Sequence, residues 1–207
     1  AQLNAKHPPR AHPIPNTLPP GLPTDRLKVK LHDKYRTLKP LAGTGISGYR
    51  NEYLTALIAT MTCPVATASV KAHEEFAAHY LNAELPAWYY YLATAIEEVG
   101  LIKNFAEEPG GTPDVRPIGQ GNCRRRAWSS QLMNDNKEIL GDSLALAQVA
   151  VGVKAGVSKI SFAVHTHMEL HPDHLLLKLD FTNAFNTTWR VSMLKAIYDS
   201  PKWRHLY

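Results

Sequence analysis

The sequence predicts a mostly helical α+β protein, preceded by an extended, proline-rich arm. Three stretches, residues 49–61, 69–82 and 88–103, space their apolar residues in the way that helices do. A leucine-rich run at residues 175–179 that ends in Asp180 is typical of a buried strand. Seven prolines among the first 24 residues exclude a helix there and favour an extended chain.

The arm carries cations and no acid. Lys6 and Arg10 lie among its prolines, and we expect both to contact RNA. Residues 26–39 then alternate charged and apolar side chains, which indicates a basic linker or a short strand. We therefore expect an arm with its linker over residues 1–38 and a folded domain over residues 39–207. The alternative is an arm that packs on its own domain.

Two features flank the predicted helices. Glycines at positions 43, 45 and 48 precede the first helix. The third helix begins with four aromatic residues at 88–91, which could stack on bases, although aromatic residues at helical spacing more often pack in a core. Residues 107–114, EEPGGTPD, predict a turn after the third helix.

Basic side chains follow that turn. Arg116 and Pro117 lead through two glycines to Arg124, Arg125 and Arg126. Guanidinium groups in a glycine-flanked turn suit phosphate binding, because they offer forked donors while glycine lets the backbone approach a ligand. The alternative is a solvated basic face with no ligand.

The last third of the sequence predicts two helices. The first has an apolar face over residues 157–168 and ends at Pro172; the second covers residues 187–199 and is capped by threonines. The apolar residues of the second helix should pack inward: Trp189, Met193, Leu194 and Ile197. Four histidines lie close together in the sequence: His165, His167, His171 and His174. We favour solvent-facing or RNA-contacting histidines over a zinc site, because no cysteine or well-spaced acid completes such a site.

Composition narrows the partners. The formal charge of +5 favours a polyanion, most simply nucleic acid, and no apolar run reaches membrane-spanning length. We expect Cys63 and Cys123 to be reduced, since they are far apart in sequence and lack metal-like spacing. The sequence has no initiating Met and no apolar signal segment, so we expect a processed organellar protein, with the mitochondrion favoured, or a fragment.

Four motifs, taken in order, carry a family resemblance. They are GTGISGYRNEYLTAL at residues 43–57, VRPIGQGNCRRR at 115–126, QVAVGVKAGVSKI at 148–160 and LLLKLDFTNAFNTTWR at 175–190. In this order they resemble the fingers motif, the Arg-Pro-Ile motif, the segment before the palm and the first palm motif of reverse transcriptases of the non-LTR retrotransposon type. The resemblance implies a helical fingers-like region that leads into an incomplete palm.

The resemblance also implies roles for single residues. Asp180 matches the catalytic palm aspartate, which binds Mg²⁺ together with the incoming nucleotide. The implied nucleotide-binding residues are Arg116, Arg126, Gln148, Asn183 and Phe185. The expected RNA-binding residues are Lys6, Arg10, Arg124, Arg125 and Arg126.

Departures from the family pattern point away from catalysis. Two-metal phosphoryl transfer needs at least a second carboxylate, and the sequence has no Tyr-x-Asp-Asp motif after Asp180. We therefore expect the chain not to polymerise alone and to need no cofactor alone. Cys123 and Arg124 stand where the family usually has apolar residues, and Lys154 stands where it has proline. Added basic groups suit passive RNA contact.

Three hypotheses about function follow. In the first, the chain is a non-catalytic, RNA-binding structural subunit of a large ribonucleoprotein, for which an organellar ribosome is a plausible case. In the second, it is part of a split RNA-directed DNA polymerase that uses Mg²⁺ and has its second aspartate motif and thumb on another chain. In the third, it is a structural subunit of a complex that contains only proteins. We favour the first.

Overall fold

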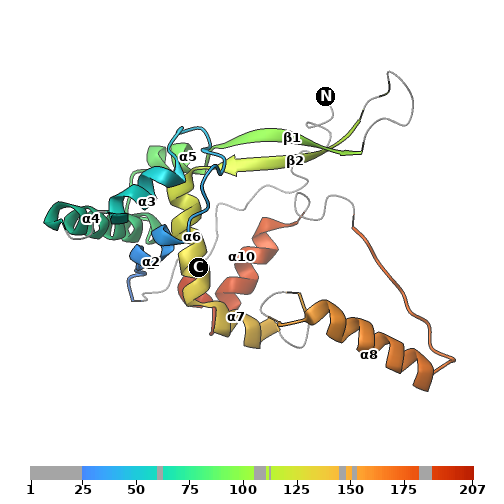
Figure 1. Ribbon diagram of the computed structural model, residues 1–207. Coiled ribbons are helices and arrows are strands. Elements are labelled where there is room, and N and C mark those ends of the chain that lie inside the picture. Colours follow the sequence, from blue (N-terminus) through green and yellow to red (C-terminus); the bar gives the residue numbers. More distant parts are fainter. Residues whose placement is uncertain are drawn as a thin grey trace. The chain divides into compact units, whose positions relative to one another are not determined.

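A computed structural model describes residues 25–59, 63–104, 111, 113–144, 148–150, 153–181 and 188–207 of the chain. Within these residues the protein forms eight α-helices, one short 3-10 helix and one two-stranded antiparallel sheet, so the predicted α+β class is confirmed. The chain divides into two compact units (Figure 1). Of the described residues, those between 25 and 132 and between 188 and 207 form the first unit, and those between 133 and 181 form the second.

Five helices and the sheet make up most of the first unit. The helices are α2 (His32–Arg36), α3 (Asn51–Ala59), α4 (Pro64–Leu81), α5 (Ala87–Thr94) and α6 (Cys123–Asp135). Helix α2 packs on α3, and α3 packs on α4. The spacing of apolar residues predicts α3 and α4 within a few residues. Pro64 stands at the first turn of α4, where its missing N–H leaves no hydrogen bond unmade.

The core of the first unit contains side chains from residues 29–35 and from α6, which lie far apart in the sequence. Its fully buried side chains are Leu31, Tyr35, Leu54, Cys123 and Trp128. Partly buried rings form an aromatic layer in which Phe76 and Tyr80 pair with Trp128, edge-on and tilted, while Tyr89 packs edge-on against Phe76 and Tyr90 stacks on Tyr80. Burial raises the pKa of Tyr35 to about 12, and its hydroxyl lies 3.0 Å from His73 Nδ1. Tyr35 therefore stays neutral at physiological pH.

The sheet corrects two predictions. Strand β1 (Ile96–Asn104) pairs antiparallel with β2 (Asp114–Gly121), with Val99 opposite Ile118 and Leu101 opposite Arg116 (Figure 1). The predicted helix over residues 88–103 is wrong in its second half, because α5 ends at Thr94. Glycine at position 100 and the β-branched residues around it favour a strand. The predicted glycine-flanked turn over residues 115–126 is wrong too, since it is a strand followed directly by a helix.

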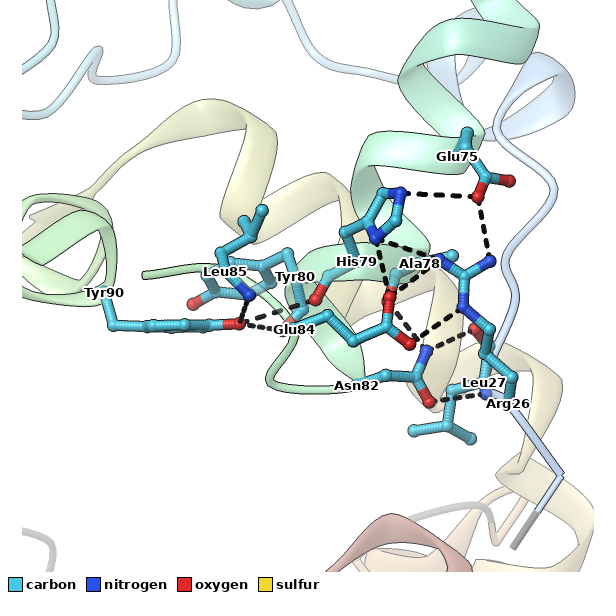
Figure 2. Close-up of polar contacts among 10 residues, drawn as sticks. All are labelled: Arg26, Leu27, Glu75, Ala78, His79, Tyr80, Asn82, Glu84, Leu85 and Tyr90. Atoms are coloured by element: carbon cyan, nitrogen blue, oxygen red, sulfur yellow. Dashed lines mark hydrogen bonds and ion pairs between the residues drawn. The ribbon is translucent and has the colours of Figure 1, made fainter. Parts of the chain in front are cut away.

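The chain before α2 is fastened to the end of α4. Arg26 donates two hydrogen bonds to Glu84, of 3.0 and 2.9 Å, and one of 2.9 Å to Glu75, while His79 Nδ1 lies 2.6 Å from Glu84 (Figure 2). Asn82 bonds the backbone N–H and C=O of Leu27 with its side-chain amide, both at 2.9 Å. These contacts hold the segment in a defined course over α4.

Residues 25–38 do not behave as a linker. Their side chains Val29, Leu31 and Tyr35 are buried in the core, and residues 32–36 form a helix where the sequence predicts a basic linker or a short strand. The boundary predicted at residue 39 therefore does not coincide with a boundary between compact units. The rest of the predicted arm, residues 1–24, lies outside the described residues.

The predicted C-terminal helix is confirmed with a later start. Helix α10 (Arg190–Asp199) is followed by the 3-10 helix η1 (Arg204–Leu206), which packs against it. Inward packing is only partly correct, because Trp189 and Met193 are exposed and only Leu194 and Ile197 are half-buried. Trp189 occupies the N-cap position and makes no side-chain cap bond, so the N-cap falls one residue after the predicted threonines, of which Thr187 lies outside the described residues.

The second unit contains helices α7 (Lys137–Leu144) and α8 (Gly156–Leu170). Helix α8 confirms the predicted helix that ends before Pro172. The buried strand predicted at residues 175–179 is wrong, because residues 171–181 are exposed and form no strand. A strand needs a neighbour to satisfy its backbone groups, and the described sheet contains only β1 and β2.

Membrane spans and the state of the cysteines are the last features of the fold that the sequence addressed. No helix in the described part of the chain combines the length and apolar character needed to cross a membrane. Cys63 is exposed, Cys123 is buried, and both are free thiols. Burial raises the pKa of the Cys123 thiol, which keeps it protonated and unreactive.

Candidate nucleic-acid interface at the start of helix α6

The junction between β2 and α6 holds the predicted arginine cluster. Strand β2 ends at Gly121, and α6 begins two residues later at Cys123. Asn122 caps the helix, because its side-chain oxygen accepts a hydrogen bond of 2.9 Å from the backbone N–H of Arg124. The cap ends the strand and starts the helix in a single residue, which presents three consecutive arginines on the first turns of α6.

A glycine loop lies against this junction. Gly45 has a left-handed backbone (φ 66°), and a Cβ placed on it would lie 2.8 Å from the carbonyl carbon of Gly121. A Cβ on Gly43 would overlap the side chain of Gln120. At Gly45 only glycine allows this close approach, because the neighbouring atoms are backbone, so Gly45 seats residues 43–45 on the end of β2.

Each arginine of the cluster has a distinct place. Arg126 donates a hydrogen bond from Nη2 to the carbonyl oxygen of Gly43, and the guanidinium of Arg125 lies against Gly121. Arg124 stacks over the ring of Tyr49, with 4.7 Å from Cζ to the ring centroid. All three side chains are half-buried. The three side chains are therefore partly covered by the protein, and the choice between a ligand site and a solvated basic face stays a prediction.

The cluster is electrostatically uncompensated among the described residues. No described carboxylate lies within ion-pair distance of Arg124, Arg125 or Arg126. Arg26 provides the contrast, because Glu84 and Glu75 hold its pKa above the ordinary value. The buried Nε atoms of Arg125 and Arg126 also have no described hydrogen-bond partner. Three half-buried positive charges without an acid favour an anionic ligand.

The positive field reaches the surrounding core. Burial lowers the pKa of His73, and the nearby charge of Arg124 lowers it further. Burial raises the pKa of Tyr80, an effect that the charge of Arg125 partly offsets. The charges of Arg124 and Arg125 therefore act on side chains of the core and of the aromatic layer.

Three other residues of the implied site are described in other parts of the chain: Arg116, Gln148 and Asp180. Arg116 is exposed on β2, five strand residues or about 16 Å along the chain from Gly121. Gln148 and Asp180 lie in the second unit, where the side chain of Gln148 accepts a hydrogen bond of 2.7 Å from the N–H of Ala150. Asp180 is exposed. The implied roles of these residues stay predictions.

Four predicted site residues lie outside the described residues: Lys6, Arg10, Asn183 and Phe185. The structure therefore places only part of the implied site, and the arginines of α6 are the part that it brings together.

The aromatic residues at 88–91 divide between core and surface. Tyr89 and Tyr90 belong to the aromatic layer, and the Tyr90 hydroxyl donates a hydrogen bond of 3.1 Å to the carbonyl of Tyr80 (Figure 2). Trp88 and Tyr91 are 63% and 80% exposed. The core interpretation holds for the first pair, and the second pair is available to stack on a base.

The histidines of the second unit gather at the end of α8. His167 Nε2 lies 3.0 Å from His174 Nδ1, and the ring of His171 stacks on that of His174 with centroids 4.8 Å apart. His165 pairs instead with Glu169, at 3.1 Å. All four are exposed, as predicted. Among the described residues, no group of three histidines, cysteines or acids is arranged to hold a metal ion.

Sequence reasoning missed three contributors to the interface: Tyr49, Asn122 and the carbonyl of Gly43. An asparagine directly before a helix is an N-cap signal and could have located the start of α6. The contacts of Tyr49 and Gly43 with arginines far along the chain leave no local signal. No protein-family model matches the chain, and no curated protein or solved structure matches it significantly.

Proposed function

We propose that this protein is a non-catalytic, RNA-binding structural subunit of a large ribonucleoprotein particle such as an organellar ribosome. The observation that carries the proposal is the cluster of three half-buried arginines on α6 with no described carboxylate partner. The resemblance to a reverse-transcriptase fingers region supports it, because such a region already handles nucleic acid.

The geometry suits phosphate better than a base edge. The guanidinium groups of Arg124 and Arg125 come from adjacent positions on α6, are half-buried and have no described acid partner, and their forked donors match the oxygens of a phosphate. Arg126 donates a hydrogen bond to the carbonyl oxygen of Gly43, so it fixes the glycine loop in addition to contributing positive charge. Contacts of this kind fix position along an RNA strand without reading its sequence.

In this proposal Asp180 has no catalytic task. It lies exposed in the second unit, apart from the arginine cluster in the sequence and in the division into units. We expect Asp180→Asn to leave the affinity for RNA unchanged. A loss of RNA affinity in Asp180→Asn equal to that in an arginine variant would contradict the proposal.

The experiment that tests the proposal is sedimentation of the protein from its native source, with and without ribonuclease, with identification of every RNA and polypeptide that travels with it. We expect a heavy particle that ribonuclease disperses. A heavy particle that is indifferent to ribonuclease would favour a protein-only complex. A small complex that contains a polypeptide with a Tyr-x-Asp-Asp motif, and that extends a primer on RNA with Mg²⁺, would favour the split polymerase.

A further inference from the structure

The segment that follows α8 exposes an unusual amount of apolar surface. Leu175, Leu177 and Leu179 are 97%, 79% and 67% exposed, and Phe181 is 71% exposed. In Figure 1 the segment is an extended stretch without helix or strand, which follows a turn at the end of α8. Within the described part of the chain, residues 175–181 make no backbone hydrogen bond. Exposed apolar side chains and unpaired backbone groups together form a template for strand pairing.

The side chains alternate along this segment. Its odd positions, 175, 177, 179 and 181, carry Leu, Leu, Leu and Phe, whereas the even positions 174, 178 and 180 carry His, Lys and Asp. Only Leu176 breaks the pattern. Because successive side chains of a strand point to opposite faces, pairing would gather the odd positions on one apolar face and the charges on the other. This is the pattern of a half-buried strand.

We propose that the segment pairs antiparallel with the same segment of a second copy of this chain, about a two-fold axis at Leu179. In this register Leu179 faces Leu179, Leu177 faces Phe181, and Lys178 faces Asp180 twice. The pairing is self-complementary, as a two-fold interface requires, and it places four apolar side chains of each copy on a shared face.

The charges select this register over its neighbours. An axis at Lys178 would place two lysines directly opposite each other, which is unfavourable. An axis at Leu177 would place Lys178 opposite Leu176 and leave both lysines without a partner. The axis at Leu179 satisfies all four charges of residues 178 and 180 and keeps the apolar face continuous.

Charge reversal tests the register directly. Lys178→Asp places acids at both 178 and 180 of each copy, and Asp180→Lys places bases at both positions. Each variant alone therefore has like charges opposite each other across the axis. We expect the dimer dissociation constant of each variant to rise about thirtyfold, from two lost attractions and two new repulsions. An equimolar mixture of the two variants restores both ion pairs, and we expect a heterodimer as tight as the wild-type dimer.

The measurement is sedimentation velocity of the full chain over a range of concentrations, with one variant carrying a fluorescent label for the mixture. The double variant Lys178→Asp/Asp180→Lys is the matched control, because it keeps the net charge and should dimerise like the wild type. Circular dichroism of each variant verifies the helices. The proposal is overturned by a wild-type chain that stays monomeric, which would assign the segment to a different polypeptide. It is also overturned by single variants that dimerise normally, or by a mixture that does not associate.

Discussion

The double variant Arg124→Gln/Arg125→Gln tests the proposed interface, because the size of its effect on RNA binding can be predicted. These two guanidinium groups are not tied to a described backbone carbonyl, whereas Arg126 holds Gly43 and is left in place. The exchange removes two positive charges from α6. We expect weaker RNA binding and a shallower dependence of affinity on salt, because each phosphate contact releases condensed counterions.

The magnitude follows from the two contacts removed. Each contact with a single-stranded phosphate contributes about 0.7 to the slope of log affinity against log salt, so the slope should fall by about 1.4. Between 50 and 200 mM salt, the wild-type affinity should then drop about sevenfold more than the affinity of the variant. Loss of the Arg124 contact with the Tyr49 ring costs about 0.5–1 kcal/mol of stability, too little to unfold a domain.

The assay is fluorescence anisotropy of a labelled single-stranded RNA, titrated at several salt concentrations. Lys28→Gln/Lys30→Gln is the matched control, since it removes the same charge from two exposed positions of the first unit. We expect this control to keep most of the wild-type slope. Equal slopes for the wild type and the arginine variant, or an equal loss in the lysine control, would refute a specific role for the start of α6.

Three further predictions concern the frame of this site. Gly48→Ala should lower the free energy of unfolding by about 1 kcal/mol, because its φ is 65° and nothing lies near the added Cβ. Gly45→Ala should lower it clearly more, because its Cβ would meet Gly121, so equal unfolding midpoints of the two variants in urea would contradict this. Burial lowers the pKa of His73, so the unfolded chain binds a proton more readily than the folded chain does. The free energy of unfolding should therefore fall as pH drops below about 6.5. In urea titrations His73→Gln should lose less of it than the wild type between pH 7.5 and 5.5. Trp128→Ala should lower the free energy of unfolding by about 3–5 kcal/mol, since the ring is 1% exposed; a loss below 1 kcal/mol in denaturant titration would contradict the core described above.

The helices with a local signal could be predicted. Helices α3, α4 and α8 place apolar residues at helical spacing within a single segment, so the sequence alone carries the pattern. Strands β1 and β2 could not be predicted in the same way, because their stability comes from pairing across a connection. The apolar residues of β1 fit either a helical face or a strand, and only the register with β2 decides between them.

The candidate site, too, combines features that have a local sequence signal with features that depend on distant contacts. The three arginines are visible in the sequence as an unusual composition, yet nothing local shows that Arg126 reaches Gly43, 83 residues away. Helix α6 has a weak pattern because its buried side chains are few: Cys123, Ala127 and Trp128. Its position is set by the core that it completes. Sequence reasoning therefore identified the charged residues but not the contacts that hold them in place.

The link between Gly43 and α6 also has a consequence for the order of events during synthesis. A ribosome that adds about 5–20 residues per second produces Arg126 roughly 4–17 s after Gly43. For that interval Tyr35 and Leu54 have no Trp128 to cover them. Until then the helices made earlier hold an incomplete core that chaperones can reach. The arginine cluster, with the RNA-binding surface that we propose for it, can form only once Arg126 has reached Gly43.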